Sequence, residues 1–240
     1  MGYLPLRHYL LKNLDAVYPC SANGTQCIHQ NWPGYTQKVF TAYLGTHDYG
    51  IGPVPHEDVF HIVSCCHISP LKRVDLLAEA LAQLKDSGLK LKWTHIGGGD
   101  TLPELQRYES EHLTFMEVDF CGAIPNQELM QFYQKTPVNL FVNTSNTEGL
   151  PVSIMEAFSF GIPAIATDVG GTSELVRNGE TGWLVPADCS AQLLAGHLRA
   201  AAACPAAEMQ LLRSHCRKLW EKSFCGEANF TRFAKEIQPI

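Results

Sequence analysis

The chain has 240 residues, of which 45% are hydrophobic and 18% are charged. This composition is typical of a folded globular protein and excludes a disordered tail, a collagen-like repeat and a coiled coil. The 18 Lys and Arg residues against 24 Asp and Glu give a net charge of −6. Because proteins that bind nucleic acid present basic surfaces to its phosphates, we expect no nucleic-acid partner.

The sequence also carries information on location and on metals. No stretch reaches the roughly 18 apolar residues of a membrane span, and residues 1–15 are too polar for a signal peptide. The nine cysteines are scattered without a CxxC pair, so we expect reduced thiols in a cytoplasmic protein. The ten histidines show no metal-ligand spacing such as HExxH, so we expect neither a metal nor another cofactor.

Taken in chain order, residues 1–58 come first and contain turn signals such as Asn23-Gly24 and Pro33-Gly34 without a long periodic stretch. We interpret them as a connecting segment rather than a separate fold. From Val59 onward, apolar runs of strand length alternate with helical periodicity. The predicted strands are Val59–Cys66, Leu89–Ile96, Leu113–Val118, Val138–Val142, Pro163–Thr167 and Gly182–Val185. The predicted helices are Lys72–Ser87, Thr101–Ser110, Asn126–Gln134 with an Asn cap, Pro151–Phe160, Thr172–Arg177, and two or three between residues 190 and 236.

This alternation predicts an α/β fold, with one doubly wound, Rossmann-like parallel sheet over residues 59–200 and C-terminal helices over residues 201–240. Ligands of such sheets bind beyond the carboxyl ends of the strands. The loops that follow Cys66, Ile96, Val118 and Val142 are therefore the predicted location of a site.

The strongest functional pattern is NTSNTEGLPVSIMEAFSFGIPAIATDVGG, residues 143–171. Pro151 suits the first position of the predicted helix, whose free amides and dipole favour an anion such as a phosphate. Gly149 allows a ligand to approach the backbone closely. Glu148 and Glu156 are placed to accept hydrogen bonds from ligand hydroxyls. The alternative is that Glu148 only complements the helix dipole and that Glu156 is a solvated surface residue.

A phosphate at this position needs a cation from elsewhere, because Arg177 is the only basic residue between Val138 and Trp183. Lys72 and Arg73 follow the first predicted strand and are candidates for a phosphate clamp, the alternative being a solvated helix face. Gly97–Gly99 also follow a strand. They form either a dinucleotide-binding loop or a tight turn, and they lack the full GxGxxG spacing.

Four segments in order, VSCCHISPLKRVDLLAEAL, WTHIGGG, FCGAIPNQELMQFYQ and the run from LFVNTSNTEGLP to GGTSELV, resemble the donor-binding C-terminal domain of a known family. This is family 4 of the GT-B glycosyltransferases, also called group 1, and especially its bacterial enzymes of surface-polysaccharide assembly. Glu148 and Glu156 coincide with the E-x7-E motif of that family.

The resemblance implies a role for each matching residue. Lys72 would contact the distal phosphate of the donor, Glu148 would lie near the donor sugar, and Glu156 would hold the ribose. His67 stands where many members have an arginine, and its charge depends on pH. The remaining implied donor-binding positions are the loop Gly149, Leu150 and Pro151, the base-reading backbone from Gly122 to Ile124, and the cleft-lining Gly97, Gly98 and Gly99.

The implied reaction is retaining transfer of a hexosyl group from UDP- or GDP-hexose to a glycan or lipid-linked acceptor. Lys72 and the helix-start amides would stabilise the departing nucleoside diphosphate. No metal is then needed, and the sequence has no Asp-x-Asp pair to hold one. Three alternatives stay open: a non-catalytic nucleotide-sugar-binding fragment, a GT-B relative such as a nucleotide-sugar epimerase, and a dinucleotide-dependent oxidoreductase.

Members of the family also have an N-terminal, acceptor-binding half. Residues 11–30 resemble the end of that half, and residues 38–51 resemble the crossover between the halves. We therefore interpret residues 1–58 as a remnant and linker, and we expect the chain alone to transfer little sugar. Any association with the inner face of the cell membrane would involve the missing half.

Overall fold

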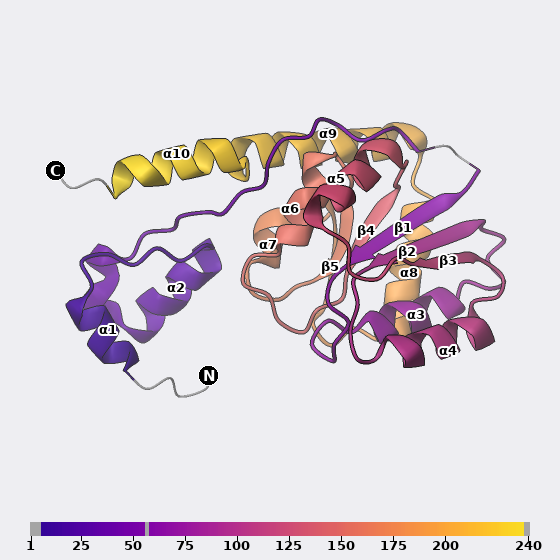
Figure 1. Cartoon of the computed structure of the whole chain (residues 1–240), viewed down its shortest axis with the longest axis horizontal. Helices are drawn as coiled ribbons and strands as arrows, with labels where there is room; N and C mark the ends of the chain where they lie inside the picture. The colour runs from indigo at the N-terminus through magenta and orange to yellow at the C-terminus, as the bar shows by residue number, and fades with distance from the viewer. Residues whose placement is uncertain (1–5, 56–57, 238–240) are drawn as a thin grey trace.

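The computed structural model describes residues 6–55 and 58–237, and its centre is a six-stranded parallel sheet (Figure 1). The strand order is β3-β2-β1-β4-β5-β6, which confirms the doubly wound α/β fold predicted from the sequence. The strands are β1 (Phe60–Cys65), β2 (Leu91–Ile96), β3 (Glu117–Phe120), β4 (Leu140–Asn143), β5 (Ala164–Thr167) and β6 (Gly182–Val185). The direction of strand addition reverses between β1 and β4, which is the point where doubly wound sheets bind ligands.

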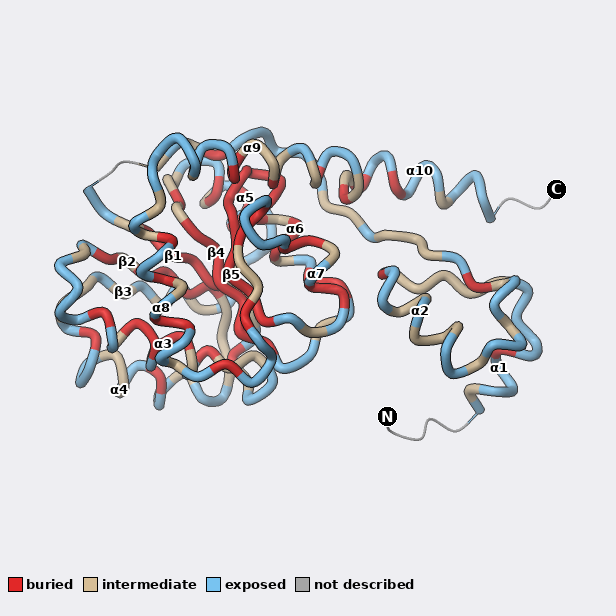
Figure 2. The backbone as a smooth tube through the Cα atoms, turned by 180° about the vertical axis from the view of Figure 1, so that it is seen from behind, coloured by how far each residue is buried: buried red, intermediate tan, exposed pale blue. Residues whose placement is uncertain are grey.

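Helices cover both faces of the sheet. One face carries α3 (Val74–Ala82), α4 (Leu102–His112) and α8 (Ala191–Ala202), and the other carries α5 (Asn126–Lys135), α6 (Val152–Ser159) and α9 (Ala206–Ser223). Leu77 and Leu198 belong to the first apolar layer, and Phe158 and Trp220 belong to the second. Because both faces are covered, β4 and β5 are buried along their whole length, and the buried residues of Figure 2 concentrate in the sheet.

The N-terminal segment (residues 6–47) contains helices that the sequence did not reveal. They are α1 (Arg7–Asn13), α2 (Ala22–Asn31) and the 3-10 helix η1 (Pro33–Lys38). Ser21 caps α2 by accepting a hydrogen bond from the Gly24 amide at 2.9 Å, so the Asn23-Gly24 pair lies inside a helix rather than in a turn. No residue of α2 is buried, and its apolar side chains, Ala22, Cys27 and Ile28, are too few for a sequence pattern to reveal the helix.

The chain then crosses from this segment to the sheet beside the last helix, α10 (Gly226–Glu236) (Figure 1). The Thr46 amide donates to the Phe224 carbonyl at 3.0 Å, and the Gly226 amide donates to the Thr46 carbonyl at 2.9 Å. Gly45 is required here because a Cβ at this position would meet the backbone of Gly226 at 2.5 Å. The crossover and the C-terminal helices are therefore in direct backbone contact.

Several predicted element bounds need correction. The predicted strand Leu113–Val118 is wrong, because β3 lies at Glu117–Phe120. Leu113 is fully buried and ends α4, and its amide donates a hydrogen bond to the Glu109 carbonyl. The apolar character of Leu113 serves the core rather than a strand. The helix predicted from Lys72 begins at Val74, because Arg73 has a left-handed backbone.

Two predicted helix starts also differ. Helix α6 begins at Val152, one residue later than predicted. Pro151 is therefore its N-cap, with an extended ψ of 106°. The predicted Asn cap of α5 is wrong, because Pro125 is the N-cap and Asn126 is already helical. The short helix α7 (Thr172–Leu175) lies between β5 and β6 in the chain. Within the part of the chain that the structure describes, no helix has both the length and the apolar character needed to cross a membrane.

Candidate functional site

The loops after β1 and β4 meet at the carboxyl edge of the sheet, and a lysine and a glutamate pair there. Lys72 Nζ lies 2.7 Å from Glu148 Oε1, with side chains that are 30% and 11% exposed. Asn143, the last residue of β4, donates from Nδ2 to the same oxygen at 3.1 Å. The structure thus brings together the residue expected to contact the donor phosphate and the residue expected to lie near the donor sugar.

The ionisation of Glu148 follows from these contacts. Burial by itself would raise the pKa of the carboxyl group, but hydrogen bonds from Lys72, Ser145 and Asn143 outweigh it, and the pKa lies below its ordinary value. Glu148 is therefore a negatively charged group whose charge is neutralised by Lys72. An ammonium group has three N–H donors, so Lys72 can donate to a further acceptor while it is paired with Glu148.

The Glu148–Pro151 loop is supported from behind and open in front. The Gly171 amide donates to the Gly149 carbonyl at 2.8 Å, and a Cβ on Gly170 would overlap the Glu148 carbonyl oxygen. Gly149 itself is exposed, with open space where a side chain would stand. Pro151 has no N–H, so Gly149 and the first residues of α6 are left to offer amides to an anion, together with the amide of Leu150.

Glu156 faces a different environment on α6. Asn126 donates from Nδ2 to Glu156 Oε1 at 2.7 Å, and burial raises the pKa of the Glu156 carboxyl above its ordinary value, an effect that this hydrogen bond partly offsets. A solvated surface residue would have neither property. The asparagine that the sequence suggested as a helix cap instead orients this glutamate.

The three glycines after β2 form a tight turn against the loop after β1. A Cβ on Gly97 would overlap the Cys66 carbonyl oxygen, and one on Gly99 would overlap that of Ile68. The Gly97 amide donates to the Gly122 carbonyl at 2.8 Å, so the predicted base-reading stretch from Gly122 to Ile124 lies directly beside this turn. The tight-turn interpretation of Gly97–Gly99 agrees with this packing.

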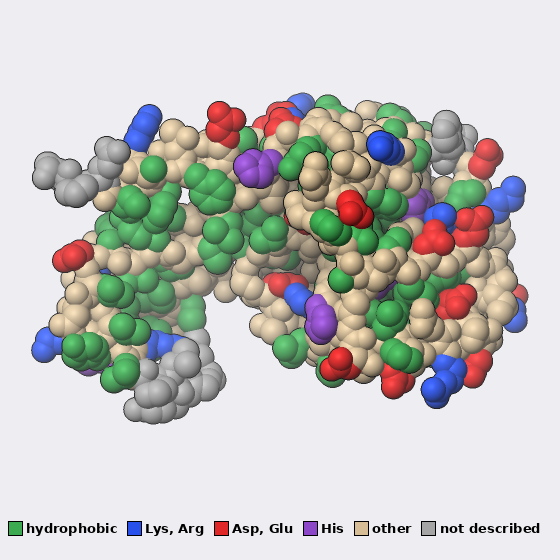
Figure 3. All heavy atoms as spheres, in the orientation of Figure 1, with side chains coloured by type: hydrophobic (Ala, Val, Ile, Leu, Met, Phe, Trp, Pro, Cys, Tyr) green, Lys and Arg blue, Asp and Glu red, His purple; other side chains and the backbone are tan. Residues whose placement is uncertain are grey.

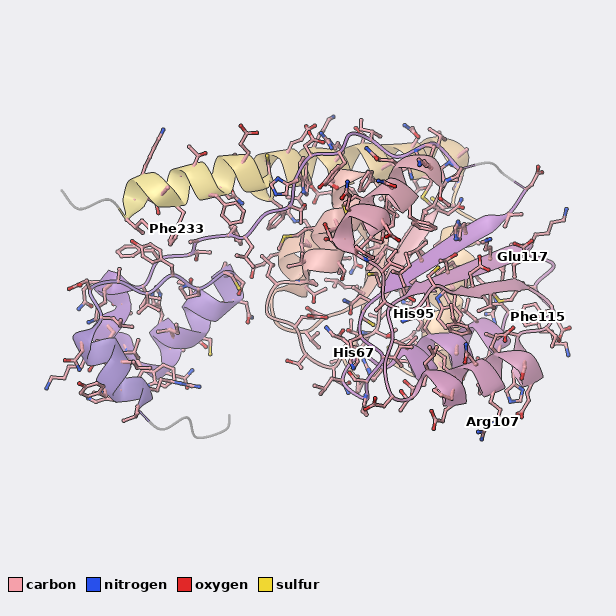
Figure 4. All side chains as sticks on the ribbon, in the orientation of Figure 1. His67, His95, Arg107, Phe115, Glu117 and Phe233 are labelled. Carbon is pink, nitrogen blue, oxygen red and sulfur yellow. The ribbon has the colours of Figure 1, made fainter. Side chains whose placement is uncertain are left out.

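The other sequence-predicted cations lie differently. His67 is exposed at the carboxyl edge of the sheet, on the side that faces the N-terminal segment (Figure 4). Arg73 is half-buried, and its Nε donates to the Thr144 carbonyl at 2.7 Å. The sequence interpretation missed Asn143 and Thr144 as site residues. Their position at the end of a fully buried strand was the available signal, because polar residues there face the ligand edge.

The described residues contain no group of three or more His, Cys, Asp or Glu that would hold a metal ion. One hollow of about 320 Å³ lies away from this edge, beside Asp58, Lys90 and Arg213. A second, of about 330 Å³, lies between α3 and α4 and reaches Ile68 and Pro70 of the loop after β1. Lys72, Glu148 and Glu156 line neither of them.

The chain is similar in sequence to known proteins. Residues 53–218 match the family described as glycosyl transferases group 1. The colanic acid biosynthesis glycosyltransferase WcaL of Escherichia coli is 28% identical over 252 aligned positions, covering 99% of this chain and 60% of that protein.

Two solved structures have the same fold. HepE of Anabaena, crystallised with UDP and glucose, superposes with a TM-score of 0.79 at 20% identity, covering 97% of this chain and 65% of HepE. The lipopolysaccharide outer core galactosyltransferase WaaB superposes with a TM-score of 0.74 at 24% identity, covering 92% of this chain and 62% of WaaB. The sheet has the fold found in GT-B glycosyltransferases, and the chain spans about 60% of the length of these relatives.

Proposed function

This chain belongs to the glycosyl transferases group 1 family, and we propose that it binds the donor of a retaining hexosyltransferase of cell-surface polysaccharide biosynthesis. The donor is a UDP- or GDP-hexose, and the acceptor is a glycan or a lipid-linked glycan. The pairing of Lys72 with Glu148 at the point where the sheet reverses is the observation that carries this proposal. It supplies a cation to a loop whose own charges are acidic.

The chemistry of the loop fits a nucleoside diphosphate. Transfer of the sugar leaves negative charge on the terminal phosphate, and an ammonium group and backbone amides held in place stabilise such charge as it develops. Lys72 provides the ammonium, and Gly149, Leu150 and the start of α6 provide the amides. No metal ion is part of this proposal. Glu156, oriented by Asn126, would accept hydrogen bonds from the ribose hydroxyls.

The relatives give independent support. HepE was crystallised with UDP and glucose, and WcaL is named for colanic acid biosynthesis. The HepE complex makes a uridine nucleotide-sugar the first candidate donor for this chain. The name of WcaL makes a surface polysaccharide the first candidate product. Membership of the group 1 family does not favour the dinucleotide-dependent oxidoreductase considered from the glycine loop.

Calorimetric titration of the chain with UDP, GDP, UDP-glucose and NAD tests the proposal. We expect binding of one nucleoside diphosphate and of its sugar derivative, and no binding of NAD. Glu156→Gln should weaken both the diphosphate and the nucleotide-sugar, whereas Glu148→Gln should weaken only the nucleotide-sugar. Binding of NAD in place of both diphosphates would contradict the proposed donor class. Equal losses for both ligands in both variants would contradict the separate roles of the two glutamates.

A further inference from the structure

The residue that follows Lys72 has an unusual backbone. Arg73 has φ 47° and ψ 47°, in the left-handed region that glycine occupies readily and other residues avoid. Among the described residues, Leu6 is the only other non-glycine residue with a positive φ. Such a conformation persists where surrounding contacts impose it, and it concentrates at functional sites.

The contacts that impose it come from the loop after β4. The Thr144 hydroxyl donates to the carbonyl oxygens of both Lys72 and Arg73, at 2.9 Å and 2.8 Å. In return, Arg73 Nε donates to the Thr144 carbonyl at 2.7 Å, and the Asn146 amide donates to the Leu71 carbonyl at 2.8 Å. The cavity left between the two loops measures only about 10 Å³. The loops that carry Lys72 and Glu148 are therefore fastened to each other across the point where the sheet reverses.

The guanidinium of Arg73 bonds to the Thr144 carbonyl and takes no part in the ion pair between Lys72 and Glu148. Its Nη2 is enclosed without a hydrogen-bond partner among the described residues. Burial raises the pKa of the Cys189 thiol, which lies just before α8, and the charge of Arg73 partly opposes that rise. The charge that acts on Glu148 is that of Lys72. Arg73 is thus bonded to the loop after β4, and its Nη2 is enclosed rather than exposed at the mouth of that loop.

We propose that Arg73 and Thr144 are positioning residues that fix the backbone of Lys72, so that Arg73 influences a donor phosphate through Lys72 and not by contact. The stem of a lysine is flexible, so the place of its ammonium depends on where the backbone holds its base. Thr144 holds that backbone, and it precedes Glu148 by four residues in the same loop. The inference rests on the proposed function for its effect on the donor. The fixing of the Lys72 backbone by Thr144 and Arg73 can be measured without a ligand.

The ligand-free readout is the pKa of the Glu148 carboxyl, followed by carbon NMR in a pH titration. Thr144→Val removes the hydroxyl, loosens Lys72 and should raise that pKa. Thr144→Ser restores the hydroxyl and should restore the wild-type value, and Thr147→Val, an exposed position in the same loop, should leave it unchanged. In a Lys72→Ala background, Thr144→Val should cause no further rise. Circular dichroism and thermal melting show that each variant is folded.

The second readout is the affinity for UDP or GDP, whichever the wild-type chain binds. Thr144→Val should weaken it about fivefold, the effect of one lost neutral hydrogen bond. In the Lys72→Ala background neither Thr144→Val nor Arg73→Gly should cause a further loss. A further loss from Arg73→Gly would show direct contact with the phosphate and overturn the inference, as would an unchanged Glu148 pKa in Thr144→Val. If the Glu148 pKa responds as expected but the wild-type chain binds neither diphosphate, the positioning of Lys72 by Thr144 is confirmed and the proposed function fails.

Discussion

The region of the sheet and the N-terminal segment (residues 6–47) are held in place by different forces. The sheet carries an apolar layer on each face, and side chains such as Trp93, Phe141 and Phe158 are fully buried. In the N-terminal segment only Leu11, Ser21 and Val39 are buried, and hydrophobic side chains collect on its visible surface in Figure 3. A segment with so little burial cannot offset the entropy cost of its own folding.

The segment is instead fixed by directional contacts with the rest of the chain. Glu174 of α7 accepts hydrogen bonds from the Ala22 and Asn23 amides at the start of α2, at 2.8 Å and 2.9 Å, and from the Tyr43 hydroxyl at 2.8 Å. The ring of Phe233, which points from α10 toward the segment (Figure 4), lies 5.1 Å from that of Tyr18. The comparison teaches that burial stabilises the sheet, whereas a few polar and aromatic contacts fix where the segment lies.

The largest expected effect is a loss of stability when the core of the sheet is disrupted. Phe158→Ala should lower the free energy of unfolding by about 3–5 kcal/mol, because it leaves a cavity in a fully buried layer. Leu10→Ala, in α1 and 52% exposed, should change it by no more than about 0.5 kcal/mol. Urea unfolding of both variants checks the difference. An equal loss in Leu10→Ala would mean that the exposed face of α1 is covered in solution.

The next effect asks which region binds the nucleotide. Lys72→Ala should weaken the affinity for a nucleoside diphosphate by roughly 1.5–3 kcal/mol, the value of a hydrogen bond to a charged group. Lys12→Ala removes the same charge from α1 and should leave the affinity unchanged. Calorimetry with UDP and GDP measures both. If Lys72→Ala also binds as the wild type does, Lys72 serves only as the partner of Glu148.

A smaller effect tests the connection between the two regions. Glu174→Gln removes the carboxylate and one of its acceptor oxygens, so the amides at the start of α2 should lose about 1–2 kcal/mol of protection from hydrogen exchange. The amides of β4 and β5 should exchange as before. Glu180→Gln, at an exposed residue close to Glu174 in sequence, is the matched control. Faster exchange throughout the sheet would show that the segment supports the whole molecule.

The same variant has a consequence for pH. Burial, followed by the hydrogen bond to Glu174 and its charge, raises the pKa of Tyr43 from 10.0 to about 12. A group whose pKa is higher in the folded chain contributes stability below its unfolded pKa, and this contribution disappears as the pH rises through the folded value. The tyrosinate absorbance of Glu174→Gln should therefore show one tyrosine titrating closer to pH 10. Tyr43→Phe identifies that tyrosine.

The smallest expected effects are those of the two glutamates, Glu148 and Glu156, on the stability of the chain. The pKa of Glu148 is lowered, so its contribution to stability is present above its ordinary pKa and is lost as the pH falls. The pKa of Glu156 is raised, so its contribution is present at low pH and is lost as the pH rises. At neutral pH, Glu148→Gln should therefore destabilise the chain and Glu156→Gln should slightly stabilise it. Urea unfolding at pH 7 gives the two signs, and matching signs would contradict the assigned environments.

Much of the site could be predicted from the sequence because parallel strands end at one edge. Lys72 follows β1 and Glu148 follows β4, so a doubly wound sheet places both at that edge although 76 residues separate them. The direction of individual side chains was not predictable in this way. Lys72 and Arg73 are neighbours in sequence, but one pairs with Glu148 and the other bonds to the Thr144 carbonyl.

What the sequence by itself determined was the alternation of strands and helices, because periodic burial is a local property that each segment carries on its own. Only the tertiary structure decided which polar groups meet. Arg73 and Thr144 are 71 residues apart, and Asn23 and Glu174 are 151 residues apart. Contacts over such distances depend on the order of strands and on the packing of helices, and a polar side chain has no period that would reveal its distant partner.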